Sequence, residues 1–124
     1  MKSSVKFDCT TNVVYAVTEG KATVDDLVSG LSNLADNEEL PRDLRIIEDS
    51  RKVKAVISQK ELLSVVPILE KLIDNYTSIF HAVIHTDQKN TAMSFLLNEL
   101  IKNNKYHLQV FSTTQAAKDW IGIK

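Results

Sequence analysis

Apolar residues recur along this chain in two patterns, short β-rich runs and longer stripes at helical spacing. The residues from Val5 to Cys9 alternate apolar and polar, and Val13-Val14-Tyr15-Ala16-Val17-Thr18 is a second β-rich run, so the pair predicts a hairpin. Leu44-Arg45-Ile46-Ile47 indicates a strand in the middle of a sheet, closed by acidic residues. Two later runs, 79–86 and 106–111, predict further strands. The pattern of residues 52–57 fits either a loop or a short irregular strand.

Four other stretches carry helical periodicity. Thr23 caps the first, whose apolar stripe extends to about Asn37. Ser58 and Glu61 form a capping box for the second, and its stripe keeps helical phase through Pro67. Because an interior proline costs ~3 kcal/mol, we expect a kinked helix there, or two short helices that share one face. The remaining two stretches are residues 91–104 and 113–121.

The order of these elements predicts the fold class. A hairpin followed by alternating helices and strands is typical of an α/β domain with a mostly parallel sheet, here with an antiparallel edge made by the N-terminal hairpin. About four helices would pack on this single-layer sheet. We expect one domain over residues 1–124, since this is the length of one typical domain.

Composition and charge exclude several classes of protein. The formal net charge is −1 and acidic and basic residues are interspersed, which disfavours nucleic acid as a partner. No apolar run approaches the ~20 residues that a membrane span needs, and the first eight residues lack the apolar core of a secretory signal. We therefore expect a cytoplasmic protein with no membrane span. The only cysteine is Cys9, which excludes an internal disulfide.

Residues suited to catalysis or cofactor binding do not gather in the sequence. The three glycines are scattered, so there is no phosphate-binding loop. No serine shows the strand-turn-helix pattern of a nucleophile. His81 and His85 lie four residues apart on a predicted strand and hence ~13 Å apart, too far to share a zinc ion. We predict no catalytic residue, no cofactor and no metal site.

The carboxyl ends of the predicted strands carry the most promising polar set. Ligands of open α/β sheets bind outside these ends, and the strand closed by Glu48 and Asp49 would end there. Helix caps and an ion pair between Asp49 and Arg51 would explain the same residues structurally. The candidate rim for a ligand or partner consists of Asp49, Ser50, Arg51, Thr86, Asp87 and Ser112, with Glu19 and Thr113 beside them.

Several of these features resemble one known superfamily. The strand that ends at Asp49, the pair Thr86-Asp87 and the closing segment 110–121, with its phenylalanine strand and Ala-x-x-x-Trp helix turn, are similar to the SpoIIAA-like or STAS superfamily. The likeness is to the small, largely uncharacterised bacterial members, and it covers nearly the whole chain.

This resemblance implies a phosphorylation switch. Anti-sigma-factor antagonists of the superfamily are switched at a serine in an Asp-Ser-Ser-Gly turn, and Ser58 falls at the position of that serine. Its neighbours Ile57, Gln59 and Lys60 lack the aspartate, the second serine and the glycine. A phosphate on Ser58 would meet a favourable helix N-terminus. Ser58 is thus a candidate phosphorylation site as well as a helix cap.

Three hypotheses for the function follow. The first is a non-catalytic binding or regulatory module that acts through a protein partner or as a homodimer. The second is a carrier of a small apolar, lipid-like ligand, because lipid-exchange domains look similar in architecture; Leu63, Ile68 and Phe95 near Pro67 would line its pocket, or fill the core or a dimer contact. The third is a small enzyme that uses the strand-end residues Asp49, Arg51 and Asp87.

Overall fold

A computed structural model describes residues 1–101 and 103–123 of the chain. Its elements follow the predicted order of a hairpin and then alternating helices and strands. They are β1 (Lys2–Asp8), β2 (Val13–Ala22), α1 (Val24–Asp36), β3 (Asp43–Ala55), α2 (Gln59–Asp74), β4 (Ser78–Ile84), α3 (Gln88–Leu100), β5 (Tyr106–Phe111) and α4 (Thr114–Ile121).

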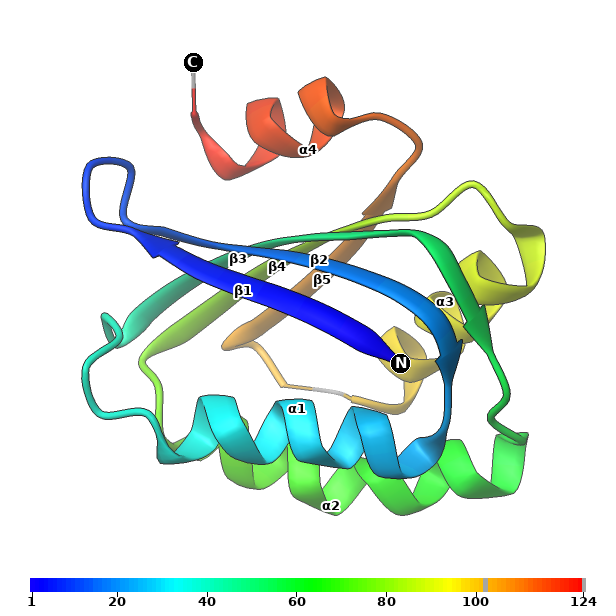
Figure 1. The fold of residues 1–124 in the computed structure, drawn as a ribbon. Coiled ribbons are helices and arrows are strands. Elements are labelled where there is room, and N and C mark those ends of the chain that lie inside the picture. The colour runs from blue at the N-terminus through cyan, green and yellow to red at the C-terminus, as the bar shows by residue number, and fades with distance from the viewer. Residues whose placement is uncertain (102, 124) are drawn as a thin grey trace.

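The five strands form one sheet in the order β1-β2-β3-β4-β5 (Figure 1). β1 pairs with β2 antiparallel, and all the other neighbours are parallel. The predicted fold class is therefore confirmed: a mostly parallel α/β sheet with an antiparallel N-terminal edge. α1, α2 and α3 lie on one face, which we call the inner face, and α4 lies on the other, the outer face (Figure 1).

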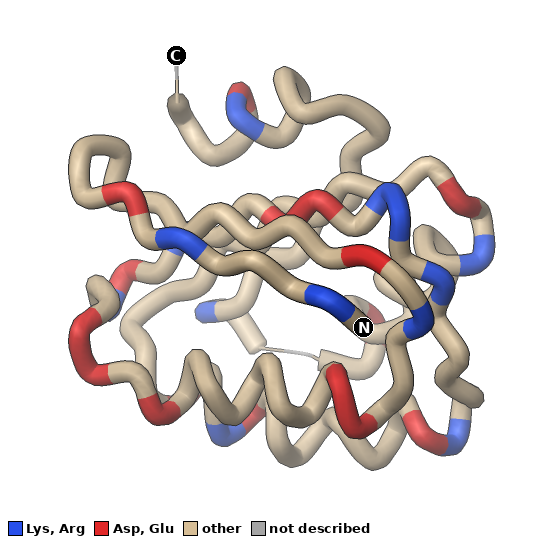
Figure 2. The backbone as a smooth tube through the Cα atoms, in the orientation of Figure 1, with Lys and Arg blue, Asp and Glu red and all other residues tan. Residues whose placement is uncertain are grey.

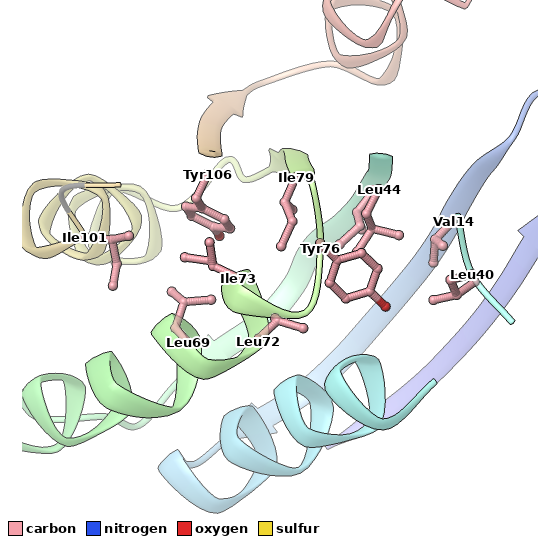
Figure 3. Close-up of a cluster of buried hydrophobic side chains, with 11 residues drawn as sticks. Val14, Leu40, Leu44, Leu69, Leu72, Ile73, Tyr76, Ile79, Ile101 and Tyr106 are labelled. Carbon is pink, nitrogen blue, oxygen red and sulfur yellow. The ribbon is translucent and has the colours of Figure 1, made fainter. Parts of the chain in front are cut away.

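The main core lies between the inner face and α2 (Figure 3). The stripe of α2 buries Leu69, Leu72 and Ile73 almost completely, and each such side chain contributes ~1.5–3 kcal/mol through burial. The Tyr76 hydroxyl donates a hydrogen bond of 2.7 Å to the Leu34 carbonyl, which ties the end of α1 to this core. A smaller core beneath α4 includes Val13, Ile47, Ala82, Ile84, Ala117 and Ile121.

The second predicted helix is one uninterrupted helix with an exposed Pro67 inside it. The alternative of two short helices is therefore wrong. Its predicted capping box is confirmed: the Ser58 hydroxyl accepts from the Glu61 amide at 3.1 Å, and the Glu61 carboxylate accepts from the Ser58 amide at 2.9 Å. The burial of apolar side chains on both sides of Pro67 outweighs the cost of the proline.

Two boundaries differ from the predictions. β3 does not end at Glu48 or Asp49 but continues to Ala55, because β2 pairs with residues 46–55 along its whole length. Ser50 and Arg51 together oppose Thr18 of β2, and this extra residue is a β-bulge. Beyond the bulge β3 continues, but the alternation of its side chains between the two faces of the sheet is shifted by one residue. α3 begins at Gln88, three residues before the predicted start, with Asp87 as its cap; residue 102, within the predicted helix, lies outside the described residues.

Candidate functional site

Five polar side chains meet on the inner face of the sheet, and we call them the inner polar cluster. His81 stands at its centre: its Nε2 lies 2.9 Å from Glu48 Oε1 and its Nδ1 lies 3.0 Å from the Tyr106 hydroxyl. The Ser50 hydroxyl donates to Glu48 Oε2 at 2.7 Å and lies 2.9 Å from the Thr18 hydroxyl. The cluster thus joins β2, β3, β4 and β5.

Strand alternation explains why these side chains meet. In β3, Leu44 and Ile46 point into the inner core, so Glu48 and Ser50 follow on the same face. In β4, His81 follows Ile79 in the same way. Because β3 lies between β2 and β4, Glu48 can be reached by residues from both neighbours. The cluster is the polar continuation of the inner core.

The electrostatics of the cluster favour an ionised Glu48. Burial by itself would raise the pKa of Glu48, but hydrogen bonds from His81 and Ser50 and the charge of His81 outweigh it and hold the pKa at about 2. The same carboxylate, together with burial as the larger cause, raises the pKa of Tyr106. The Glu48 side chain is 31% exposed and that of His81 16%, so the pair is shielded but not sealed from water.

His85 lies just beyond β4 near this cluster. Its Nδ1 is buried and has no hydrogen-bond partner among the described residues. Burial lowers the pKa of His85, partly offset by the nearby charge of Glu48. His85 is therefore held in its neutral form at neutral pH.

This arrangement satisfies the hydrogen bonds of its acid and its base within the protein. Both carboxylate oxygens of Glu48 and both ring nitrogens of His81 already have partners within the protein. A buried network with its hydrogen bonds satisfied rigidifies the core. Within residues 1–101 and 103–123, no three His, Cys, Asp or Glu side chains gather closely enough to hold a metal ion.

The three rim residues predicted on β3 do not lie at a strand end. Ser50 is buried within the inner polar cluster. Asp49 points to the outer face and pairs with Arg51, whose Nη2 lies 2.7 Å from Asp49 Oδ2. Hydrogen bonding to Arg51 lowers the pKa of Asp49. The expectation that these residues collect at a carboxyl end is wrong, because the strand continues past them to Ala55.

The other rim residues do follow strand ends. Thr86 is exposed beyond β4 and lines an open hollow of about 240 Å³ with Gln88, Thr91, Ala92 and Phe95. Asp87 caps α3 through the Lys89 amide, at 3.4 Å. Ser112 is exposed between β5 and α4. The structure therefore separates the predicted rim into an ion pair, a buried serine, one helix cap and two exposed loop residues, Thr86 and Ser112.

The structure also places the residues of the predicted apolar pocket and the candidate phosphorylation site Ser58. Leu63 is 54% exposed and Phe95 is more than half exposed, so these two side chains do not line an enclosed pocket. Ser58 is exposed at the start of α2, where its hydroxyl caps the helix. Its phosphorylation stays a prediction.

A second candidate surface is the edge of the sheet that β1 forms. Every residue of β1 from Lys2 to Phe7 is exposed, and β1 has only β2 as a neighbour in the sheet. The apolar side chains Val5 and Phe7 are 63% and 36% exposed. This strand is an open edge.

The likeness of this chain to known proteins is one of fold. No protein-family model matches the chain, and no curated protein matches its sequence. Among solved structures, an uncharacterised protein of the DUF3478 family with a SpoIIAA-like fold, from Shewanella loihica PV-4, matches with a TM-score of 0.61. The match covers 96% of this chain and 93% of that chain, at 12% sequence identity. The chain has a SpoIIAA-like fold.

Within this SpoIIAA-like fold, sequence reasoning missed the inner polar cluster. The sequence predicts Glu48 at a strand end and relates His81 only to His85. The available signal was alternation: Glu48, a charged residue, continues the inward-facing series of Leu44 and Ile46. A charge at an inward position of a central strand requires a partner on a neighbouring strand.

None of the helices in the described residues has the length and apolar character that crossing a membrane requires.

Proposed function

We propose that this chain is a non-catalytic protein-binding module that takes up its partner along the open edge of β1. The observation that carries this conclusion is that β1 is exposed from Lys2 to Phe7 and that, within the described residues, its only neighbour in the sheet is β2. An edge strand presents a row of N–H and C=O groups that can pair with another strand. Extended peptides bind proteins in this way, with main-chain hydrogen bonds for affinity and alternate side chains for specificity.

The two faces of β1 differ in chemistry. Residues opposite each other in an antiparallel pair point to the same face, so Val5 and Phe7, opposite Ala16 and Val14, point to the inner face. Their exposed apolar surface is available to the side chains of an added strand. Burial of Val5 and Phe7 would contribute to binding.

A second copy of the chain also fits this edge. In an antiparallel pair with Val5 opposite Val5, Lys2 of each copy would lie opposite Asp8 of the other. Opposite charges at such positions stabilise a sheet. A homodimer is therefore one form that this binding can take.

The hydrogen bonds of the inner polar cluster count against a catalytic role for it. Its acid and base, Glu48 and His81, are engaged with each other and with Ser50 and Tyr106. The residues suggested for a small enzyme are used structurally: Asp49 pairs with Arg51, and Asp87 caps α3. The exposure of Leu63 and Phe95 counts against the apolar-carrier alternative, although its third residue, Ile68, is half-buried.

The test is to block the edge. The double variant Val5→Lys/Phe7→Lys places charges on the face that an added strand must cover. The control Leu63→Lys changes an apolar residue on α2 whose exposure lies between those of Val5 and Phe7. Light scattering and affinity capture followed by mass spectrometry are run on all three proteins. We expect an associated species, either a dimer or a captured protein, that is present in the wild type and the Leu63 variant and lost in the β1 variant. A wild-type protein that is strictly monomeric and captures nothing, or an associated species that the β1 variant retains, would contradict the proposal.

A further inference from the structure

The outer face of β1, β2 and β3 is basic, although the chain as a whole carries a formal charge of −1. Five exposed lysines belong to this face by strand alternation and register: Lys2, Lys6, Lys21, Lys52 and Lys54. We call them the outer lysine face. Figure 2 shows Lys and Arg gathered along β1 and where β2 and β3 bend.

Acidic residues do not neutralise this face. Glu19 lies between Lys2 and Lys52 in the sheet register and balances one charge. Asp49 is already paired with Arg51 at 2.7 Å, and Asp8 lies at the far end of β1. Net positive charge therefore remains on the outer lysine face.

One lysine pair is in an unfavourable position for stability. Lys21 and Lys54 are direct partners across β2 and β3. Like charges on neighbouring strands repel each other, and an anionic partner would relieve the repulsion. Beside them, Lys2, Glu19, Gly20 and Lys52 line an open hollow of about 580 Å³ with Met1. α4 does not cover this region, since it packs against β3, β4 and β5.

We propose that the partner of this chain is an extended protein segment in which acidic side chains alternate with apolar ones. This inference rests on the proposed function, because it takes β1 as the pairing strand. A strand added beside β1 would place alternate side chains next to Lys2 and Lys6 on the outer face, and the intervening ones next to Val5 and Phe7 on the inner face. Charge complementarity selects acids for the first set and burial selects apolar residues for the second.

A protein segment fits these observations better than nucleic acid or an anionic membrane. Only a polypeptide can pair with the backbone of an edge strand. Single-stranded nucleic acid binds proteins with aromatic platforms, whereas Val17, at the centre of this face, is aliphatic and Tyr15 is only partly exposed. The apolar Val5 and Phe7 also point away from the lysines, to the other side of the sheet.

The probe is a synthetic nine-residue peptide of alternating glutamate and valine, labelled for fluorescence anisotropy. Its controls are a peptide of the same composition with the glutamates in one block and a peptide of alternating lysine and valine. The protein variants are Lys2→Glu/Lys6→Glu and, as a matched control, Lys60→Glu/Lys71→Glu, which reverses two exposed charges on α2.

We expect saturable binding of the alternating acidic peptide that weakens with added salt and falls at least tenfold in Lys2→Glu/Lys6→Glu. The α2 control should bind within twofold of the wild type, and the alternating lysine peptide should bind the charge-reversed protein better than the wild type. Equal binding of the blocked peptide, or no binding of the alternating one, would overturn the inference. Tighter lysine-dependent binding to a single-stranded oligonucleotide or to phosphatidylserine vesicles would also overturn it.

The two proposals fail in different ways. If Val5→Lys/Phe7→Lys abolishes association while Lys2→Glu/Lys6→Glu leaves it unchanged, pairing at β1 stands and the acidic character of the partner is wrong. If neither variant affects association, β1 is not the binding edge.

Discussion

Glu48 and His81 are 33 positions apart in the chain, yet Glu48 Oε1 and His81 Nε2 lie 2.9 Å apart on neighbouring strands. This contact makes the inner polar cluster the main electrostatic feature beneath the helices. It also determines how the stability of the protein should respond to substitution and to pH.

Replacing Glu48 with glutamine should destabilise the protein. The change leaves the partners Ser50 and His81 partly unsatisfied in a shielded site, at an expected cost of about 1–3 kcal/mol in the free energy of unfolding at pH 7. Because the pKa of Glu48 is held at about 2, below its ordinary value of 4.5, its stabilisation is present above pH ~4.5 and is lost as pH falls toward 2.

Urea denaturation at pH 7, 4 and 2.5 measures this effect. The difference between the wild type and Glu48→Gln should shrink over that range. The matched control is Glu70→Gln, which changes an exposed glutamate on α2 and should shift stability by less than about 0.5 kcal/mol. A pH-independent difference at Glu48 would contradict an ionised, hydrogen-bonded carboxylate.

His85 should make the protein sensitive to mild acid. Burial lowers the pKa of His85 below its ordinary value of 6.5, so the unfolded chain takes up a proton at a higher pH than the folded one. Its contribution to stability is therefore complete above pH ~6.5 and declines as pH falls below that value. His85→Gln should lose less stability than the wild type between pH 7.5 and 5, as measured by thermal unfolding. The exposed His107, changed to glutamine, provides the control, and an equal pH response in all three proteins would contradict the prediction.

Ser58→Ala should cost about 1 kcal/mol of stability, because it removes the hydroxyl that accepts a hydrogen bond from the Glu61 amide at the start of α2. Ser58→Asp should retain most of the stability, since aspartate also caps a helix and favours its N-terminus. Chemical denaturation of the two variants measures the difference. Equal stability of alanine and wild type would show that the cap contributes little here.

Pro67→Ala should stabilise the protein. Pro67 is exposed inside a continuous helix, so its ring makes no deep packing contact that alanine would lose, while alanine restores a backbone donor. We expect a gain of about 1–3 kcal/mol, below or near the ~3 kcal/mol by which proline disfavours a helix interior. The gain should appear as a higher urea midpoint with an unchanged slope. A loss of stability would mean that Pro67 relieves strain in α2.

Local chemistry made much of the fold predictable. The cap of α1, the capping box of α2 and the apolar stripes of both helices depend on residues three or four positions apart, and the β-rich runs predicted every strand. The predicted rim fared differently, because whether a strand stops at Asp49 or continues depends on its neighbour. β2 extends to Ala22 and offers pairing to β3 as far as Ala55, across a bulge at Ser50 and Arg51.

The sequence by itself determined which segments form strands and helices and which sides of them are apolar, since these follow from periodicity within a few residues. Only the tertiary structure decided that Glu48 meets His81, that His81 meets Tyr106, and that lysines from three strands share one face. Such contacts depend on strand order and register, which join positions far apart in the chain and leave no local pattern in any one segment.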